Sequence, residues 1–456
     1  MAEHHRPPAS SEHAARQLAW EILQRVEDGA FADALLGHRL SGGKLEPRDA
    51  GLVTRLVYST LTWQTYLDHL LAPFSRRPLT QVDPPIRSLL RMAMAQMCVL
   101  TRVPSFAAVD TAVELAKSHG RGAAGFVNAV LRKAAGKWQS VPLPPTDDRP
   151  AFLSVRWSHP RWLVERWLEI YGDSETEALL QANNEPAPTV VRANRLRCDP
   201  RELLIELRAL GLEVEPCRYA PLGLRLDHAP GLDRLPAYRD GVFSLQGEAS
   251  QLVAHILAAR PGEKVLDVCA APGGKSLHSA ELMDDRGSVV ARDIHARGVA
   301  RIRKEAERLK LTIVKAEIAD AVRWSAHAAV EPFDRVLVDA PCSGLGTLRA
   351  HPELKWKRRP DDSGGLAALQ LRILDGAAAE VGPGGVLVYS TCTILPEENE
   401  EVTARFLATH PQFILSNPIA DLPEPMRALI GEDGALRTLP HRHGLDGFYA
   451  VRLMRR

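Results

Sequence analysis

The 456-residue sequence lacks the patterns that mark zinc proteins, disulfide-stapled proteins and membrane proteins. Its six cysteines stand far apart and form no C-x-x-C pair, which disfavours both a zinc site and a disulfide framework. No apolar run is long enough to span a bilayer. The segment Met1–Ser11 carries histidines, an arginine and prolines but no apolar core, so we expect a disordered tail and no signal peptide. We therefore expect a protein of the reducing cytoplasm with no metal and no membrane contact.

A strong charge of either sign is also missing. The formal net charge is +1, which argues against a wholly basic surface made for nucleic acid. The charge is uneven, because residues 1–140 carry +5, residues 141–240 carry −3 and residues 241–456 carry −1. With 45% hydrophobic residues, a chain of this length predicts two or three domains with ample core. The basic part is the first third.

Hydrophobic periodicity divides the chain into three regions. In residues 12–140 apolar side chains recur at helical spacing, for example at Leu18, Ile22 and Val26. A proline-rich stretch that begins at Val141 marks the first boundary. Residues 141–240 mix predicted helices and strands and are expected to include an RNA-binding segment. The predicted strand at 190–194 places Arg192 beside apolar residues, as in an RNA-facing sheet, and the favoured alternative is that Arg192, Arg195 and Arg197 are exposed loop charges. In residues 241–456 predicted strands alternate with helices, as in an α/β domain.

A turn with paired glycines lies between a predicted buried strand at 264–268 and a predicted helix at 277–282. Its residues are Cys269, Ala270, Ala271, Pro272, Gly273, Gly274 and Lys275. Glycines there let backbone N–H groups approach a ligand, and the helix N-terminus favours a carboxylate or phosphate. A phosphate-binding P-loop would need glycine in place of Cys269, and the dinucleotide pattern G-x-G-x-x-G is absent. The turn predicts a nucleoside site without a pyrophosphate.

Acidic residues follow the next predicted strands. Asp293 stands nineteen residues beyond Gly274, at the end of an apolar stretch, about where a ribose-binding carboxylate belongs in a doubly wound sheet. A solvated aspartate at a strand end is the alternative. Asp320 is the candidate for the adenine side, although Glu317 lies close by in sequence and could serve instead.

Two cysteines follow the ends of further predicted strands. Residues 333–338 lead to Asp339 and Cys342, and residues 385–389 lead to Cys392, so both thiols could face one cleft at the ligand-binding edge of the sheet. A thiolate can add to carbon 6 of a cytosine, direct electron density to carbon 5 for methyl capture, and leave after carbon 5 loses its proton. The alternative is that each cysteine is a small buried hydrophobe. Asp339 could hold the base or contact the cofactor, and the sequence does not separate these roles.

Four segments resemble motifs of the Nol/Nop/Sun RNA (cytosine-C5) methyltransferases, and of their bacterial Sun/Fmu-type branch in particular. They are VLDVCAAPGGK at 265–275, DAPCSG at 339–344, HPELKW at 351–356 and STCT at 390–393. The resemblance implies that S-adenosyl-L-methionine binds to the 269–275 turn, Asp293, Asp320 and Asp339. It also implies that Cys392 is the catalytic nucleophile and that Cys342 helps to release the methylated product. Residue chemistry alone does not rank the two cysteines.

Two positions depart from the usual pattern of this family. Ala319 precedes Asp320 where the family usually has glycine, and Thr393 stands where serine is common after the nucleophile. Neither change removes a reactive group.

The first region resembles the NusB-like RNA-binding helical domain of Sun/Fmu-type enzymes, on the segments SFAAVD at 105–110 and GFVNAVLR at 125–132. The expected architecture is an all-α NusB-like domain over 12–140, a small α+β middle domain over 141–240, and a Rossmann-like α/β methyltransferase domain with a mostly parallel sheet over 241–456. Arg132 and Lys133 belong to a basic stretch that could bind phosphates, and a solvated helix face is the alternative.

A second basic segment follows Cys342. Arg349, Lys355 and Lys357 surround Trp356, which offers positive charge and one stacking surface for single-stranded RNA. A buried tryptophan covered by solvated charges is the alternative. We expect a monomeric enzyme that methylates a cytosine in small-subunit (16S) ribosomal RNA. The same chemistry on transfer RNA, or an RNA-binding protein without activity, are the alternatives.

Overall fold

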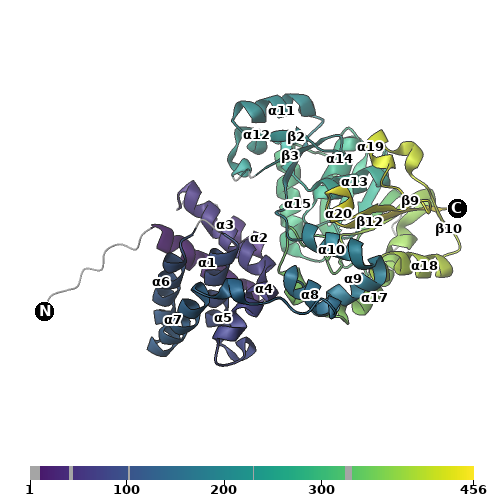
Figure 1. Ribbon diagram of the computed structural model, residues 1–456. Coiled ribbons are helices and arrows are strands. Elements are labelled where there is room, and N and C mark those ends of the chain that lie inside the picture. The colour runs from purple at the N-terminus through teal and green to yellow at the C-terminus, as the bar shows by residue number, and fades with distance from the viewer. Residues whose placement is uncertain (1–10, 41–44, 101–102, 228, 230, 324–330) are drawn as a thin grey trace. The chain divides into compact units, whose positions relative to one another are not determined.

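The computed structural model describes residues 11–40, 45–100, 103–227, 229, 231–323 and 331–456, and Figure 1 traces the chain. Apart from Ser11, the expected disordered tail lies outside the described residues. The chain forms two compact units, one of Met1–Glu185 with Leu348–Arg359 and one of Pro186–Thr347 with Pro360–Arg456. The predicted domain boundaries after residues 140 and 240 stay predictions.

The first unit is built from α-helices in the part of it that the structure describes. These are α1 (Ser11–Glu27), α2 (Ala32–Leu40), α3 (Pro47–Thr62), α4 (Gln64–Leu71), α5 (Pro84–Cys98), α6 (Ser105–Ala116), α7 (Arg121–Ala135), α8 (Arg149–Arg156), α9 (Arg161–Tyr171), α10 (Asp173–Ala182) and the short α16 (Leu354–Lys357). Helix α5 starts with proline, whose fixed φ suits the first turn. It buries Leu89, Leu90, Met92 and Met94 in the core that it shares with α1, α3, α6 and α7.

The second unit contains two sheets and the helices that pack on them. Its elements are β1 (Thr189–Ala193), α11 (Pro200–Ala209), β2 (Val214–Pro216), β3 (Gly223–Leu226), α12 (Pro236–Arg239), β4 (Phe243–Leu245), α13 (Glu248–Leu257), β5 (Lys264–Asp267), α14 (Gly274–Leu282), β6 (Ser288–Asp293), α15 (Ala296–Leu309), β7 (Val314–Ile318), β8 (Phe333–Asp339), α17 (Asp362–Glu380), β9 (Val381–Thr391), α18 (Glu400–Thr409), β10 (Phe413–Leu415), α19 (Glu424–Arg427), β11 (Leu436–Thr438), α20 (Pro440–His443) and β12 (Phe448–Arg455). Both sheets and most of these helices can be followed in Figure 1.

The smaller sheet has four antiparallel strands in the order β2-β3-β1-β4. Helix α11 packs beside β2 and β3, and it begins with a capping box in which Asp199 and Glu202 satisfy backbone N–H groups at the helix start. The core under this sheet includes Val191, Leu203 and Phe243. This arrangement is the expected α+β region.

The larger sheet has eight strands, of which seven follow the order β10-β12-β9-β8-β5-β6-β7, while β11 pairs with β12. The neighbours from β9 to β7 pair in parallel, and β12 joins β9 in the antiparallel direction. A mostly parallel sheet of this kind confirms the predicted Rossmann-like domain. Because the five parallel strands share one direction, their carboxyl ends meet at one edge of the sheet.

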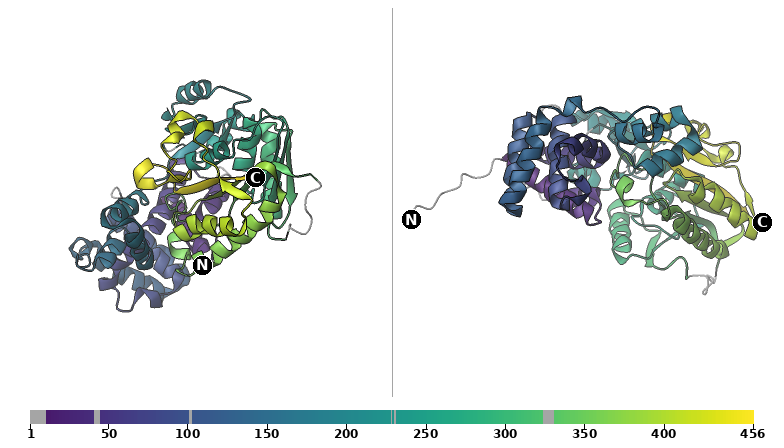
Figure 2. Two further views of the ribbon diagram at one scale, coloured as in Figure 1. Left: turned by 90° about the vertical axis from the view of Figure 1, so that its right-hand side faces the viewer. Right: turned by 60° about the horizontal axis from the view of Figure 1, so that its bottom comes forward.

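Both faces of the larger sheet are covered. Val265 and Leu337 pack with α13 and α14 in one core, whereas Leu266 and Val336 pack with α17 and α18 in another, as the alternation of side chains along a strand requires. Strands buried on both faces read as continuous apolar runs, which is why the sequence shows them clearly. The sheet and its covering helices are seen from two further sides in Figure 2.

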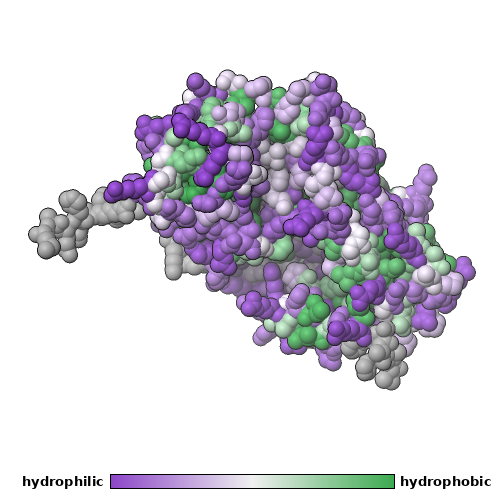
Figure 3. All heavy atoms as spheres, turned by 90° about the horizontal axis from the view of Figure 1, so that it is seen from below, coloured by the Kyte–Doolittle hydropathy of each residue, from purple (hydrophilic) through white to green (hydrophobic). Residues whose placement is uncertain are grey.

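The surface is mostly hydrophilic on the face drawn in Figure 3, where hydrophobic residues form scattered patches. None of the helices within the described ranges combines the length and the apolar character needed to cross a membrane.

Candidate active site

The predicted turn lies at the carboxyl edge of the larger sheet, between β5 and α14. Gly273 adopts a φ of +109°, a conformation that favours glycine, and an added Cβ there would lie 3.1 Å from Ile302. Asp267 ends β5 and is buried, and its carboxylate accepts hydrogen bonds from Ser276 Oγ (2.6 Å) and the Cys269 N–H (3.3 Å). Burial raises the pKa of Asp267 to about 7.

Asp293 lies beside the turn, as its position in the sequence predicts. Its two carboxylate oxygens accept hydrogen bonds from the Ala271 N–H (3.0 Å) and the His295 N–H (2.8 Å). Asp320 follows β7 at the same edge of the sheet, and its carboxylate accepts a hydrogen bond from the Val322 N–H (3.0 Å). Asp293 is the last residue of β6, and Asp320 lies two residues beyond the end of the neighbouring parallel strand β7.

Two exposed isoleucines, which the sequence reasoning missed, flank these aspartates. Ile294 is 58% exposed directly after Asp293, and Ile318 is 60% exposed at the end of β7. Large apolar side chains are usually covered in a folded protein, so these two offer apolar surface at a ligand-binding edge. Together with the carboxylates, they fit a nucleoside whose ribose is hydrogen-bonded and whose base is covered by apolar side chains. The signal in the sequence was an isoleucine next to each strand-end acidic position.

Lys275 of the turn reaches across to the neighbouring strand β8. Its Nζ lies 2.6 Å from Asp339 Oδ2, and the Ser390 hydroxyl donates to Asp339 Oδ1 at 2.8 Å. Burial opposes the charge of Lys275, but the Asp339 carboxylate outweighs it, so that the pKa of Lys275 is raised. Lys275 and Asp339 therefore form an ion pair at the carboxyl edge of the sheet.

Cys342 and Cys392 lie side by side. Their Sγ atoms are 3.3 Å apart, so the structure brings the two predicted thiols together at the ends of β8 and β9. A hydrogen bond with Cys392, and then burial, raises the pKa of the Cys342 thiol. A thiol with a raised pKa carries little thiolate near neutral pH.

A buried polar network, which sequence reasoning did not foresee, joins the two cysteine loops. The hydroxyls of Ser343 and Thr393 lie 2.7 Å apart, and Glu398 Oε2 accepts hydrogen bonds from the Ser343 N–H (2.8 Å) and Gln370 Nε2 (2.9 Å). Thr393, which departs from the family's serine, thus keeps the hydroxyl that the network uses. The network holds the two thiols in one place.

Arg192 requires a correction. The structure places it in β1, where it is 1% exposed and forms an ion pair with the fully buried Glu281, instead of leaving it as a loop charge. Its guanidinium also donates to the Gly274 carbonyl at 3.1 Å. Only the arginine in the middle of an otherwise apolar strand could have signalled this role.

The 348–359 segment also requires a correction, because it belongs to the first unit. Lys355, which we expected to bind RNA, is fully buried, and its Nζ donates to Asn184 Oδ1 (2.6 Å) and to the carbonyls of Thr62 and Ser158. Burial lowers the pKa of Lys355 well below its usual range. The Lys355 side chain is therefore not accessible to RNA in this structure.

The side chains that follow Lys355 in sequence also donate hydrogen bonds to carbonyls within the first unit. The indole N–H of the half-buried Trp356 donates to the Leu61 carbonyl at 2.7 Å, and Lys357 Nζ donates to the carbonyls of Gly29 (2.9 Å) and Ala30 (2.6 Å). Arg349 is half-buried. Arg132 and Lys133 of α7 are exposed, and Arg132 donates to Asn128 at 2.8 Å. Of the expected RNA contacts, these two have the most accessible side chains.

One group of possible metal ligands lies within the described residues of the first unit. Asp33, His351 and Glu353 place one ligand atom each within 4.8 Å of one another. One oxygen of Glu353 already accepts the Ala32 N–H at 3.0 Å, which caps α2. The group therefore has a structural use without an ion.

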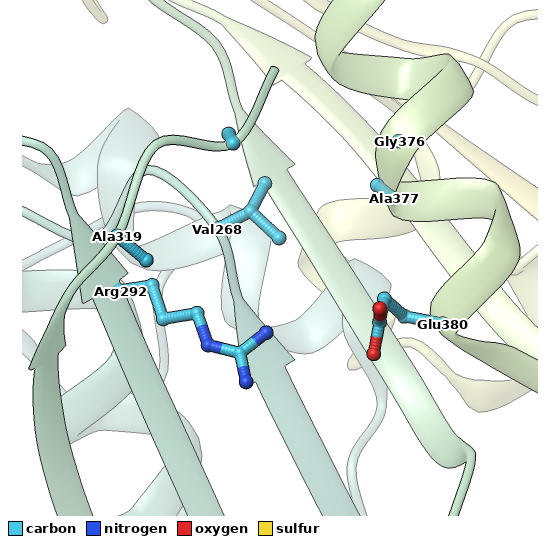
Figure 4. Close-up of a pocket in the computed structure, with 7 residues that line it drawn as sticks. Val268, Arg292, Ala319, Gly376, Ala377 and Glu380 are labelled. Atoms are coloured by element: carbon cyan, nitrogen blue, oxygen red, sulfur yellow. The ribbon is translucent and has the colours of Figure 1, made fainter. Parts of the chain in front are cut away.

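A small pocket lies beside the sheet edge and is lined by none of the predicted catalytic residues. Its walls come from Val268, Arg292, Ala319, Ala321, Gly376, Ala377 and Glu380. Figure 4 shows the Arg292 guanidinium and the Glu380 carboxylate facing the same space. It adjoins the Asp320 loop but not the thiols.

The strand order and the turn at the sheet edge define a Rossmann-like methyltransferase. Three family models match consecutive parts of the chain: the NusB family at 13–136, the ferredoxin-like domain of the RsmF/B-like methyltransferases at 159–233, and 16S rRNA methyltransferase RsmB/F at 254–454. The chain belongs to this RsmB/F family, which confirms the predicted resemblance and the predicted NusB-like region.

Individual relatives agree with the family models. The chain is 41% identical over 438 residues to the probable ribosomal RNA small subunit methyltransferase B of Bacillus subtilis, with 95% of this chain and 97% of the relative covered. It is 35% identical to ribosomal RNA small subunit methyltransferase B of Pseudomonas putida, with 90% and 92% covered. Among solved structures, PH0851 is similar with a TM-score of 0.84 and 29% identity over 98% of this chain and 99% of that chain. A methyltransferase homolog protein from Pyrococcus horikoshii has a TM-score of 0.58 and 26% identity over 68% and 99%.

Proposed function

We propose that this protein transfers the methyl group of S-adenosylmethionine to carbon 5 of a cytosine in 16S ribosomal RNA, through a covalent cysteine adduct at carbon 6. The relatives named above are ribosomal RNA small subunit methyltransferases, which supports the substrate class. The observation that supports this chemistry is the pair of thiols. Their Sγ atoms lie 3.3 Å apart at the same edge of the sheet as the 269–275 turn, which we call the cofactor turn. A methyltransferase that acts on an oxygen or an exocyclic nitrogen needs no thiol, because those atoms are nucleophiles themselves.

The residues fit the donor molecule. Asp293 ends β6 and Asp320 lies just beyond the neighbouring strand β7, where carboxylates can accept hydrogen bonds from a ribose and an adenine. Ile294 and Ile318 can cover the adenine faces. When bound, S-adenosylmethionine supplies an electrophilic methyl group. The turn offers backbone N–H groups and the N-terminus of α14 to its carboxylate.

Cys392 acts as the nucleophile in this proposal. Its thiolate bonds to carbon 6 of the cytosine, and the electron pair of the 5,6 double bond then forms the new bond between carbon 5 and the methyl group. The bond from this methyl group to the donor sulfur breaks at the same time, and S-adenosylhomocysteine is the leaving group. Lys275 belongs to the same site, where its Nζ lies 2.6 Å from Asp339 Oδ2. Transfer of the carbon 5 proton to solvent then restores the double bond and expels Cys392 as a thiolate. Cys342, whose raised pKa favours the protonated thiol, would protonate the departing Cys392 thiolate and recover a proton from solvent.

Asp339 holds the centre of the site together. It is bound by Lys275 and Ser390 on its two oxygens, and a carboxylate oxygen retains a further lone pair for the amine of a cytosine. The base must leave any stack to reach the pocket, which costs about a few kcal/mol and least in loops. A loop or hairpin of ribosomal RNA suits this requirement.

The test uses Cys342→Ala, with Cys392→Ala as its control. Incubation with S-adenosylmethionine and 16S RNA should leave Cys342→Ala in a protein–RNA complex that survives denaturing electrophoresis, because release is impaired. The wild type and Cys392→Ala should show none. Bisulfite mapping of the product from the wild type gives the modified cytosine, and transfer RNA serves as the competing substrate. An adduct on Cys392→Ala, with none on Cys342→Ala, would reverse the two roles.

A further inference from the structure

The buried Arg192 forms hydrogen bonds with α14, the helix that begins in the cofactor turn. Arg192 lies in β1 of the smaller sheet, and Glu281 lies near the end of α14; the two side chains are 1% and 0% exposed. The contact is bidentate, with Nε to Oε2 at 3.1 Å and Nη2 to Oε1 at 2.7 Å. Both residues belong to the same compact unit.

Stability alone gives no reason for such a pair. Taking two charges out of water costs several kcal/mol per ion, and replacing a buried pair with apolar side chains of similar volume is often neutral or stabilising. A buried ion pair can, however, make contacts that apolar packing cannot make. Arginine can do so, because its guanidinium has further donors after it has bound a carboxylate.

The remaining nitrogen of Arg192 points at the cofactor turn. Its Nη1 donates to the Gly274 carbonyl at 3.1 Å and to the side chain of Gln246. Gln246 covers the same glycine, because a Cβ added at Gly274 would lie 3.3 Å from Gln246 Nε2. Arg192 thus fixes the first residue of α14 through a carbonyl and its last turn through Glu281.

The two residues of α14 that Arg192 contacts lie on one face of the helix. Gly274 and Glu281 are seven residues apart, which is nearly two full turns. The residues between them point elsewhere: Lys275 reaches Asp339, and Ser276 reaches Asp267. A rotation or slide of α14 would move Lys275 relative to Asp339 and Cys392.

We propose that Arg192 is a positioning residue for the cofactor turn, so that the smaller sheet is a working part of the donor site. This inference rests on the function proposed above. It gives β1 a role in the donor site, although β1 lies outside the sequence motifs at the strand ends of the larger sheet. It also implies that residues 241–456 without β1 would hold the turn poorly.

The experiment compares double variants of the full chain. Arg192→Met with Glu281→Met removes both buried charges, and so avoids the unpaired carboxylate that Arg192→Met alone would leave. The matched control is Arg335→Met with Glu263→Met, a bidentate pair of 2.9 Å contacts at the other end of β8 and β5. Each protein is titrated with S-adenosylhomocysteine by calorimetry, and its thermal unfolding is recorded.

We expect the Arg192/Glu281 variant to unfold within a few degrees of the wild type but to bind S-adenosylhomocysteine at least tenfold more weakly. The KM for S-adenosylmethionine should rise by a similar factor, while the KM for RNA stays within twofold. Arg192→Lys, which keeps the charge but not the fork, should fall between the two. The control pair should leave the Kd unchanged.

Two results would overturn the proposal. One is a folded Arg192/Glu281 variant with the Kd of the wild type, which would make the pair purely structural. The other is an equal loss of affinity in the control pair. If the variant does not fold, Gln246→Leu tests the same contact to Gly274, and an unchanged Kd there counts against the proposal. A wild-type protein that does not bind S-adenosylhomocysteine would instead refute the proposed function.

Discussion

The edge of the larger sheet and the 348–359 segment carry neighbouring sequence motifs but differ in what fixes their roles. At the carboxyl edge of the larger sheet, the predicted site residues Asp293, Asp339 and Cys392 lie at the ends of parallel strands or directly after them. The strand order alone therefore brings these residues to one side. In the 348–359 segment, the cations around Trp356 do not follow a predicted strand, so the sequence does not indicate which groups they contact. Its lysines end up bound to carbonyls of the first unit. A charge next to a strand end is therefore easier to interpret than a charge in a loop.

The largest effect that separates the two regions should come from Asp339. Asp339→Asn keeps the shape of the side chain but removes the charge that faces Lys275 at 2.6 Å. Loss of a preorganised charged group in an active site typically costs about 10²–10³-fold in kcat. We expect a fall of this size in methyl transfer to 16S RNA, measured with a tritiated donor, together with a lower midpoint of thermal unfolding, because the largely buried Lys275 ammonium loses its carboxylate partner. A normal kcat would show that Asp339 acts in folding only.

The next effect concerns Lys355 and should appear in stability. Lys355→Ala removes a buried amine and leaves Asn184 Oδ1 and two carbonyls without their donor. We expect the free energy of unfolding to fall by at least about 3 kcal/mol, because three groups lose their donor and each costs about 1–3 kcal/mol. Denaturant titration measures this change.

Lys133→Ala is the matched control for Lys355, since Lys133 is exposed on α7. Exposed substitutions usually change stability by less than about 0.5 kcal/mol. If the first unit binds RNA, Lys133→Ala should instead weaken RNA binding and reduce its salt dependence. The reverse pattern, with Lys355→Ala stable and defective in RNA binding, would restore the original interpretation of the loop.

The same contrast explains what the sequence could predict. Strands such as β5 and β8 are buried on both faces and give continuous apolar runs, so the sheet and the turn after β5 were predictable, and the residues of four motif segments carried the resemblance to the family. Arg192 and Lys355 were misread because isolated charges are usually exposed. Their partners, Glu281 and Asn184, are 89 and 171 residues away in sequence. Nothing local in the chain could have identified those partners.

The smallest effect is a pH dependence that arises from Asp267 at the cofactor turn. Burial raises its pKa to about 7 in the folded protein, whereas an unfolded aspartate has a pKa of about 3.9. The folded state therefore binds more protons than the unfolded state between these values. The resulting stabilisation is fully present below about pH 4 and is lost as the pH rises through about 7.

Asp267→Asn replaces the protonated carboxyl group with a neutral amide and should remove this dependence. Between pH 6.5 and 7.5 we expect the free energy of unfolding of the wild type to lose roughly 0.7 kcal/mol more than that of the variant. The exposed Asp240 provides the control, because Asp240→Asn should keep the slope of the wild type. Urea titrations at the two pH values give the comparison. Equal slopes in all three proteins would mean that Asp267 is already ionised at pH 6.5, with Ser276 and the Cys269 N–H stabilising its charge more than burial opposes it.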